Sequence, residues 1–454
     1  MPDKEAITLH PDAKRTFDEK ASLLAASLTP DPKVFDDSQH VPINPYVTAT
    51  IGKDDIIPES NVWSKADHSG REHARYFQAG DRVVGLEGET YLAFRRLAES
   101  IQRTQALRDS ISLDTIIDLL TSWLRLTLKG QPELSATDFI LSKCREMVGE
   151  YTVLLPLYEL YVEESFELGR VLIRTITAEE IDRWVERQSK EDPERAESYK
   201  QSGERAKQKH QGKAAASITL LAEPKRAYEV ARREAEDALA MLQVFSIGVL
   251  VPEARCYWTL FGSEKVESFT YFILQGSDLK NGATGYYGAP NTVWMLSKAL
   301  LVDLKSRGLD AASALLRESK RNDFQEHVVD ALLLYSRAAL QGGVTEKLLY
   351  ILVALESLLL RDETELIGQN LAERLAVVIG GNVDERKAII KTTREVYRLR
   401  SRFVHHGVEI DDVKTMDEFM LYASVFFEKI LKATDLFQTK IALLDALEAK
   451  RLSY

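Results

Sequence analysis

The chain has 454 residues, of which 45% are hydrophobic and 28% are charged, a composition typical of globular proteins that bury sizeable cores. Its formal net charge of −11 argues against broad, non-specific adhesion to nucleic acid, so any nucleic-acid site must be a local basic patch. No apolar run approaches the roughly 18–20 residues that span a bilayer. The N-terminus lacks the pattern of a signal peptide. The two cysteines, Cys144 and Cys256, fit neither a disulfide framework nor a metal-ligand spacing. We therefore expect a cytoplasmic protein with reduced thiols, no cofactor, no metal and no membrane contact.

The first third of the chain predicts mixed structure and then helices. Weak periodicity followed by a strand-then-helix pattern marks residues 1–110 as an N-terminal mixed region. Apolar residues recur at helical spacing through residues 111–150, and Ser135 or Thr137 is the expected N-cap of the second helix there. We interpret residues 111–150 as a helical connection.

Residues 151–305 predict one α/β domain, because runs rich in aliphatic and β-branched residues alternate with helical segments. Thr177, three residues before Glu180, predicts a capping box at the start of a helix. Residues 185–213 are almost wholly polar, which favours a solvated helix or a mobile excursion. A strand-like pattern returns at 255–262.

Residues 320–454 contain five amphipathic helical segments, several of them separated by Gly or Asn. This pattern predicts an antiparallel helical bundle. The expected fold class is therefore α+β, with mixed α/β regions followed by an all-α bundle.

One helix of this bundle is expected over residues 384–404. The sequence VYRLRSRFVHHG, residues 396–407, covers its last turns and the residues that follow. At about 100° per residue, its apolar residues form one stripe. The stripe comprises Ile389, Ile390, Thr393, Val396, Tyr397, Phe403 and Val404. A second stripe is basic and comprises Lys387, Lys391, Arg394, Arg398 and Arg402. On its own such a basic ridge is typical of a solvated helix face.

Arg400 lies within the apolar stripe, where a guanidinium is costly to bury unless it is paired. Glu356, on a mostly apolar helix, is the expected partner; alternatively, the stripe faces a second subunit and Arg400 lines a cleft between protomers. On a continuous helix His405 diverges from Arg400 by roughly 140°. His405 can turn back toward Arg400 if the helix frays near Phe403, and Gly407 is a good stop signal.

The spacing from Arg400 to His405 is the R-x4-H pattern of HEPN domains, and residues 320–454 resemble the Apea-like HEPN branch. The resemblance rests on VYRLRSRFVHHG together with the earlier segments DALLLYSRAAL and VALESLL. It implies a helical bundle that commonly dimerises and sets two motifs around one cleft. Many such domains are metal-independent endoribonucleases, while others have lost activity and serve as scaffolds or nucleotide binders.

The residue types fit RNA cleavage by the 2′-hydroxyl, which needs proton transfer and positive charge at the phosphate. We assign proton transfer to His405, phosphate stabilisation to Arg400 and orientation to Ser401, with His406 as a substitute base. Structural support is expected from Glu356 and Tyr397. The cations expected to hold flanking phosphates are Lys391, Arg394, Arg398 and Arg402.

The expected function is thus that of a bacterial defence or toxin endoribonuclease acting on RNA, such as tRNA or another structured RNA, as a homodimer. The alternative is a non-catalytic HEPN dimer that serves as a scaffold or sensor.

Overall fold

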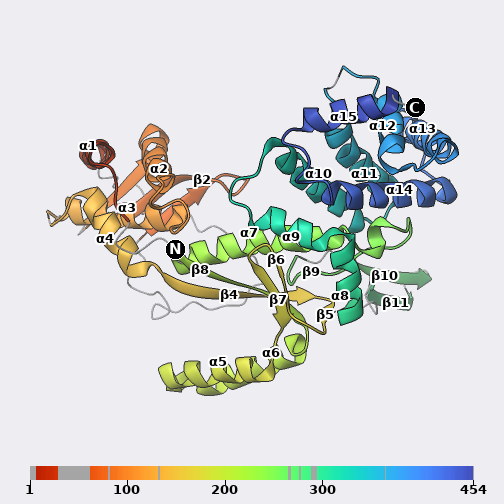
Figure 1. Cartoon of the computed structure of the whole chain (residues 1–454). Coiled ribbons are helices and arrows are strands. Elements are labelled where there is room, and N and C mark those ends of the chain that lie inside the picture. Colours follow the sequence, from red (N-terminus) through yellow and green to blue (C-terminus); the bar gives the residue numbers. More distant parts are fainter. Residues whose placement is uncertain are drawn as a thin grey trace. The chain divides into compact units, whose positions relative to one another are not determined.

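The computed structural model describes residues 7–28, 62–79, 82–130, 133–263, 267–275, 278–287, 294–362 and 364–452. The fold is α+β: helices and strands mix in the first two thirds, and a run of helices completes the chain (Figure 1). The chain divides into two compact units. Unit 1 comprises residues 1–153 and 219–230, and unit 2 comprises residues 154–218 and 231–454.

Unit 1 packs helices against an antiparallel sheet of order β1-β2-β3. The strands are β1 (Val62–Ala66), β2 (Glu72–Ala79) and β3 (Arg82–Glu87), and the helices are α1 (Pro11–Ser27), α2 (Gly88–Gln102), α3 (Leu113–Leu128) and α4 (Ala136–Met147). One apolar core draws on all four helices, so residues 111–150 share a core with the segment before them. Ser135, one of the two expected caps, accepts the Asp138 amide at the start of α4.

A five-stranded sheet of order β6-β7-β8-β4-β9 belongs mostly to unit 2, and the start of β4 and the end of β8 belong to unit 1. Its strands are β4 (Gly149–Tyr158), β6 (Phe166–Leu168), β7 (Val171–Thr175), β8 (Ala214–Ala222) and β9 (Thr259–Leu260). Beside it, β5 (Leu160–Val162) pairs in parallel with β12 (Trp294–Leu296), and β10 (Glu267–Gln275) pairs with β11 (Asp278–Tyr287) as a hairpin. The strand-like stretch 255–262 contributes only the two residues of β9 to the sheet.

The polar excursion is a helical hairpin, which we call the α5–α6 arm. It comprises α5 (Ala178–Glu191), a short 3-10 turn (Pro193–Arg195) and α6 (Ala196–His210). The capping box expected from Thr177 and Glu180 is confirmed at the start of α5. Gly203 of α6 lets the two helices approach closely, because a Cβ atom there would lie 2.4 Å from a methyl group of Val185.

Between the sheet and the final bundle lie α7 (Pro224–Gln243), α8 (Lys298–Leu304) and α9 (Asp310–Arg317). A π-helical turn, Lys305–Leu309, joins α8 to α9. Gly308 in this turn has a φ of 128°. Its left-handed backbone suits glycine, and a Cβ atom there would lie 3.1 Å from Leu431.

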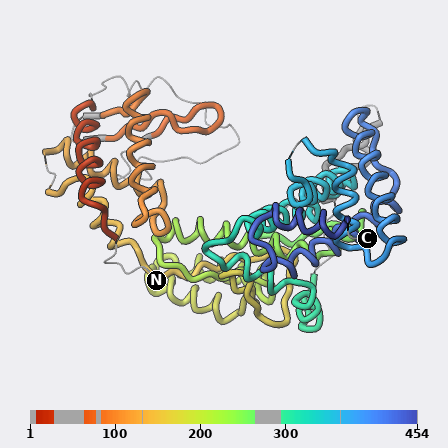
Figure 2. The backbone as a smooth tube through the Cα atoms, turned by 45° about the horizontal axis from the view of Figure 1, so that its top comes forward, coloured from red at the N-terminus to blue at the C-terminus, as the bar shows by residue number. Residues whose placement is uncertain are grey.

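The bundle follows the expected segments and adds one more helix at the end (Figure 2). Its helices are α10 (Asp323–Ala339), α11 (Val344–Leu359), α12 (Ile367–Ile379), α13 (Val383–His406), α14 (Val413–Leu431) and α15 (Lys440–Leu452). In the core, the rings of Tyr335 and Phe427 stack with centroids 4.2 Å apart. Across the part of the chain that the structure describes, no helix combines the length and apolar character needed to cross a bilayer.

A buried lysine ties the start of α11 to the segment after α7. Lys347 is fully buried, and its ammonium donates hydrogen bonds to the backbone carbonyls of Gly248 at 2.9 Å, Val251 at 3.2 Å, and Ala254. An ammonium group has three donors, so these carbonyls satisfy it completely.

Candidate functional site

The helix α13 that carries the candidate motif is continuous through both histidines. Asn382 caps its start by accepting the Glu385 amide at 2.9 Å. Gly407, with a left-handed φ of 65°, ends it by donating its amide to the Phe403 carbonyl at 2.8 Å. The helix does not fray near Phe403, so His405 and His406 occupy its last turn.

The buried stripe of α13 stops before the helix does. Its buried residues are Ile389, Thr392, Thr393, Val396 and Leu399. Phe403 is only half-buried and Val404 is 49% exposed, so the expectation that Val404 faces the core is wrong. Val404 has the right angular position, but the last turns of α13 extend beyond the packed core.

Glu356 pairs with Tyr397 rather than with Arg400. The Tyr397 hydroxyl donates a hydrogen bond to Glu356 Oε1 at 2.8 Å. Burial, the Glu356 charge and this hydrogen bond raise the pKa of Tyr397, and the nearby Arg400 charge acts in the opposite direction. Tyr397 lies about one turn before Arg400 on the same stripe and meets Glu356 instead.

Arg400 itself is half-buried, and no described carboxylate forms an ion pair or hydrogen bond with it. The expected Arg400–Glu356 pair is therefore wrong. Because Arg400 keeps contact with solvent, it does not need the compensating carboxylate that full burial would demand.

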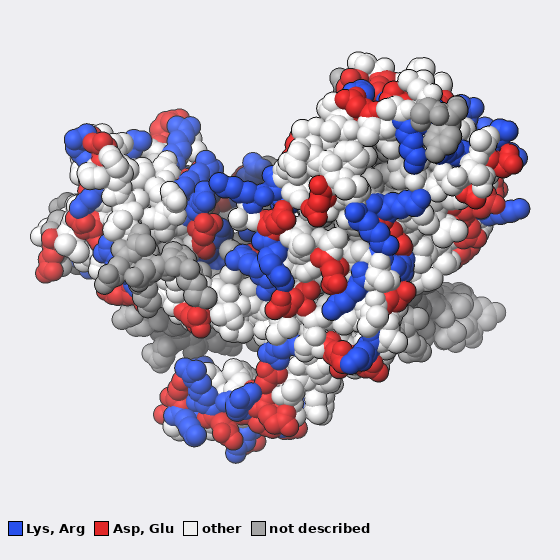
Figure 3. Space-filling view, in the orientation of Figure 1, with Lys and Arg blue, Asp and Glu red and all other residues white. Residues whose placement is uncertain are grey.

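The four ridge cations Lys391, Arg394, Arg398 and Arg402 are all exposed. Arg394 lies 3.8 Å from a carboxylate oxygen of Glu373, and Arg398 forms a salt bridge with Glu395. Lys391 and Arg402 form no hydrogen bond or ion pair with a described residue. Two of the four positive charges are therefore partly neutralised. Basic and acidic groups also intermingle over the molecular face drawn in Figure 3.

The continuous helix places His405 on the basic ridge. At about 100° per residue, His405 lies within roughly 20° of Arg398, 40° of Ser401 and 60° of Arg402, but about 140° from Arg400. Both His405 and His406 are exposed, and their ring centroids lie 6.5 Å apart. His405 thus shares one side of α13 with Arg398, Ser401 and Arg402. His406 lies beside Arg402, and Arg400 stands on another side.

A neighbouring surface escaped the sequence analysis, and we call it the Tyr397 patch. Val353, one turn before Glu356 on α11, is 46% exposed, and Ile367 at the start of α12 is 39% exposed. A Cβ atom on Gly368 would lie 3.3 Å from the Tyr397 ring, which places the start of α12 against α13. The patch comprises Val353, Glu356, Ile367, Tyr397, Arg400 and Val404. The sequence VALESLL did not reveal this patch, because the exposure of Val353 depends on how α11 packs.

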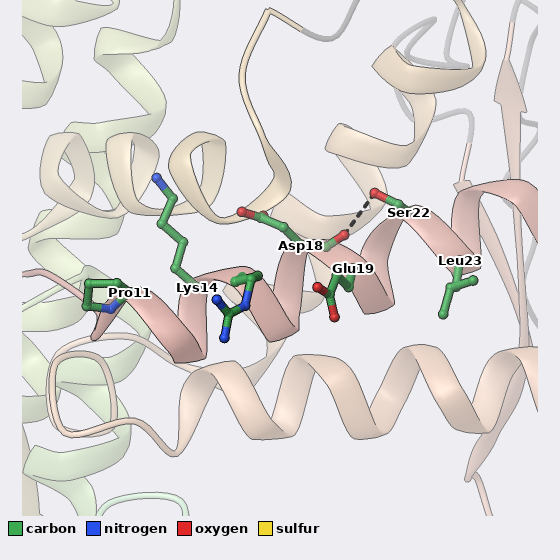
Figure 4. A pocket seen from close by; sticks show the side chains of 7 residues that line it. Pro11, Lys14, Asp18, Glu19, Ser22 and Leu23 are labelled. Atoms are coloured by element: carbon green, nitrogen blue, oxygen red, sulfur yellow. Dashed lines mark hydrogen bonds between the residues drawn. The ribbon is translucent and has the colours of Figure 1, made fainter.

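Hollows among the described residues lie elsewhere, in unit 1. One of about 850 Å³ runs along α1, and its lining residues all belong to that helix (Figure 4). Asp18, within this hollow, accepts hydrogen bonds from the amide and hydroxyl of Thr137 at 2.8 and 2.9 Å. Asp18 is therefore occupied in packing α1 against α4, and this hollow offers no convergent set of groups for chemistry.

Comparison with known proteins yields no family: no family model, no curated protein and no solved structure matches the chain.

Proposed function

We propose that the chain is a metal-independent endoribonuclease of the bacterial defence or toxin type, acting in the cytoplasm on RNA. The observation that carries this proposal is the end of α13, where the exposed His405 shares a helix side with Arg398 and Arg402. An imidazole exchanges protons near neutral pH. A planar guanidinium can donate two parallel hydrogen bonds to two oxygens of one phosphate.

In the proposed reaction, His405 takes the proton from the ribose 2′-hydroxyl, which attacks the adjacent phosphate. The Arg402 guanidinium, three residues away, stabilises the charge that develops on the phosphorane. Ser401 orients the phosphate, and His406 protonates the leaving 5′-oxygen or replaces His405 as base. The products carry a 2′,3′-cyclic phosphate and a 5′-hydroxyl.

Arg400 enters this proposal through a second copy of the chain. It cannot reach the His405 side of its own helix, because α13 is continuous and the two positions differ by about 140°. A two-fold dimer across the Tyr397 patch would cover Val353 and Val404, which are 46% and 49% exposed. It would also direct Arg400 of one protomer toward the His405 side of its partner.

The first test uses purified protein and total RNA in EDTA, with the cleavage ends mapped chemically. We expect cyclic-phosphate or 3′-phosphate ends, and a loss of about 10²–10⁴ in rate for His405→Ala. His327→Ala is the matched control, because His327 is a half-buried histidine on another helix of the same bundle. Cleavage that requires magnesium and leaves 3′-hydroxyl ends would overturn the proposal, as would a wild-type rate in His405→Ala/His406→Ala.

The second test asks whether the site is shared between protomers. Sedimentation should show a species of about twice 51.3 kDa. Arg400→Ala and His405→Ala are each expected to be inactive, but their mixed dimer regains one intact site and up to half of the wild-type rate. If the mixed dimer stays inactive while both variants remain dimeric, Arg400 acts within its own protomer or not at all.

A non-catalytic dimer is the second candidate, and the partial neutralisation of the ridge favours it. Glu373 lies beside Arg394, and Glu395 forms a salt bridge with Arg398. These carboxylates reduce the positive charge that the ridge can offer to RNA. In this case His405→Ala has no effect in any assay, whereas Tyr397→Phe, which removes the hydrogen bond to Glu356, weakens dimerisation.

A further inference from the structure

A second group of cations gathers in unit 2, near the point where the arm joins the sheet. Figure 1 shows the backbone at this point. The Phe261 ring, just after β9, lies 4.4 Å from the Lys209 ammonium and has its centroid 4.8 Å from that of His210. The Tyr158 ring at the end of β4 lies 6.3 Å from the Phe261 ring and 6.0 Å from the Lys213 ammonium. Two lysines and a histidine therefore meet around two aromatic rings.

Carboxylates balance only part of the charge in this group. Lys213 forms a salt bridge with Glu159 at 3.6 Å, whereas Lys209 pairs with no described carboxylate. Lys207 lies one turn of α6 before His210 and forms salt bridges with Asp182 and Glu204. The group thus holds a net positive charge, and neither the Lys209 nor the Lys213 ammonium donates a hydrogen bond to a described residue.

His210 is the unsatisfied member of the group. Its Nδ1 is buried and has no hydrogen-bond partner among the described residues. Burial and the positive charges of Lys209 and Lys213 lower the pKa of His210. Burial and the neighbouring cations thus disfavour the charged imidazole, and an anion placed among these cations would favour it.

We propose that Lys209, His210 and Lys213 form a binding site for a phosphate group, carried by inorganic phosphate or by a nucleoside monophosphate. The two ammonium groups supply charge and hydrogen bonds, and the His210 imidazole adds a third positive charge beside them once it is protonated. Phe261 is already contacted by Lys209 and His210, so the rings position the cations instead of offering a stacking face for a base. This site is independent of the endoribonuclease proposal, because none of its residues belongs to the bundle.

The test follows the imidazole signals of the full-length protein by NMR. The eight histidines of the chain give few signals, and His210→Gln identifies that of His210. Titrations with inorganic phosphate and with AMP at constant ionic strength should shift this signal and raise the pKa of His210 by about one unit. Tighter binding of AMP than of phosphate would identify a nucleotide as the source of the phosphate group, and equal binding would identify the free anion.

Matched variants on one helix give the control. Lys209→Gln should weaken phosphate binding about tenfold, because it removes one charge-assisted contact. Lys200→Gln removes an equal charge from the exposed face of α6, where Lys200 pairs with Glu197, and should bind normally. Lys213→Arg keeps the charge beside Glu159 and should retain binding, which guards against loss of folding.

Three outcomes would overturn the proposal. The first is an unchanged His210 signal at about 10 mM phosphate or AMP, well above the millimolar range of weak sites. The second is equal weakening by Lys209→Gln and Lys200→Gln. The third is a response of His210 to an RNA oligonucleotide when phosphate and AMP have none, since a polymer site would then replace the phosphate site.

Discussion

Glu365 shows how strongly one carboxylate can depend on one guanidinium in this bundle. Arg374, which is 8% exposed, donates hydrogen bonds to both Glu365 oxygens at 2.6 and 2.7 Å and another to the Leu359 carbonyl. The Arg374 hydrogen bonds lower the pKa of Glu365 to about 2, against the opposing effect of burial. The pair fixes the chain between α11 and α12.

This pair should make the bundle sensitive to acid. The folded-state pKa of Glu365 lies below its unfolded value, so its contribution is complete above about pH 4.5 and is lost as pH falls toward 2. Glu365→Gln should cost about 3 kcal/mol near pH 7, because it leaves Arg374 without its charge partner. Melting temperatures at pH 7 and pH 3 test this: the two proteins should converge in acid. A constant difference between them would contradict the assignment.

Lys347 predicts a pH dependence in the same direction as that of Glu365, but in an alkaline window. Burial lowers the pKa of Lys347 to about 8 from an ordinary value of 10.5, so the native state holds fewer protons than the unfolded chain between these values. The contribution of Lys347 to stability therefore rises with pH across this window. Lys347→Met, which leaves three backbone carbonyls without a donor, should lower the melting temperature at every pH. The deficit should grow from pH 8 to pH 10. Lys320→Met, at an exposed position, is the control.

Residue chemistry also marks where prediction from sequence ends. Periodicity correctly identified the exposed ridge through Arg398 and Arg402, because angular position follows from the helix repeat. It could not show that Tyr397 would take Glu356, since two polar groups on one stripe compete for the same partner. Periodicity also could not show how far the packed core extends along α13. That extent determines how exposed Val404 and Arg400 are.

At the scale of elements, local signals were the most informative. The capping box of Thr177 and Glu180 fixed the start of α5. Helix α1 escaped notice because it buries only Phe17, Ala21 and Leu24 and so has weak periodicity. The strand-like stretch before β9 mostly stays outside the sheet. Trp258 there stacks on Trp294, with centroids 4.7 Å apart, so its aromatic residues serve packing rather than pairing.

The α5–α6 arm should respond to a change at its closest approach. Gly203→Val places a branched side chain where a Cβ atom alone would lie 2.4 Å from Val185, so the helices must separate. Amide exchange should accelerate in residues 178–210 by about tenfold or more, as about 1.4 kcal/mol of local stability is lost. The rest of unit 2 should keep its protection. Ser202→Val, at an exposed neighbouring position, is the control, and equal acceleration in both variants would contradict the packing argument.

At the scale of the whole molecule, the charge of −11 opposes the attraction that the proposed RNA site on the α13 ridge would exert on phosphates. Each phosphate contact with single-stranded RNA contributes about −0.7 to the slope of log K against log salt concentration. In a His405→Ala background, which prevents cleavage, Arg402→Gln should reduce this slope by about 0.7. Lys387→Gln is the matched control, because Lys387 lies near the other end of the ridge beside Asp384. An unchanged slope in Arg402→Gln would remove Arg402 from the RNA contact.

The base of the α5–α6 arm has a consequence for how this chain can vary in length. Ile176 donates its amide to Lys213 at 2.9 Å, and Gly212 donates to Ile176 at 3.0 Å, directly beyond the Thr175–Ala214 pair of β7 and β8. The chain therefore leaves and rejoins the sheet at a single rung. The segment between Ile176 and Lys213 can therefore be shortened or replaced without a change in the order of the strands. Replacement of residues 177–212 by Asn-Gly would turn β7 and β8 into an ordinary two-residue hairpin. The arm is thus an insertion between β7 and β8 that can be deleted or replaced by another segment while the sheet stays intact.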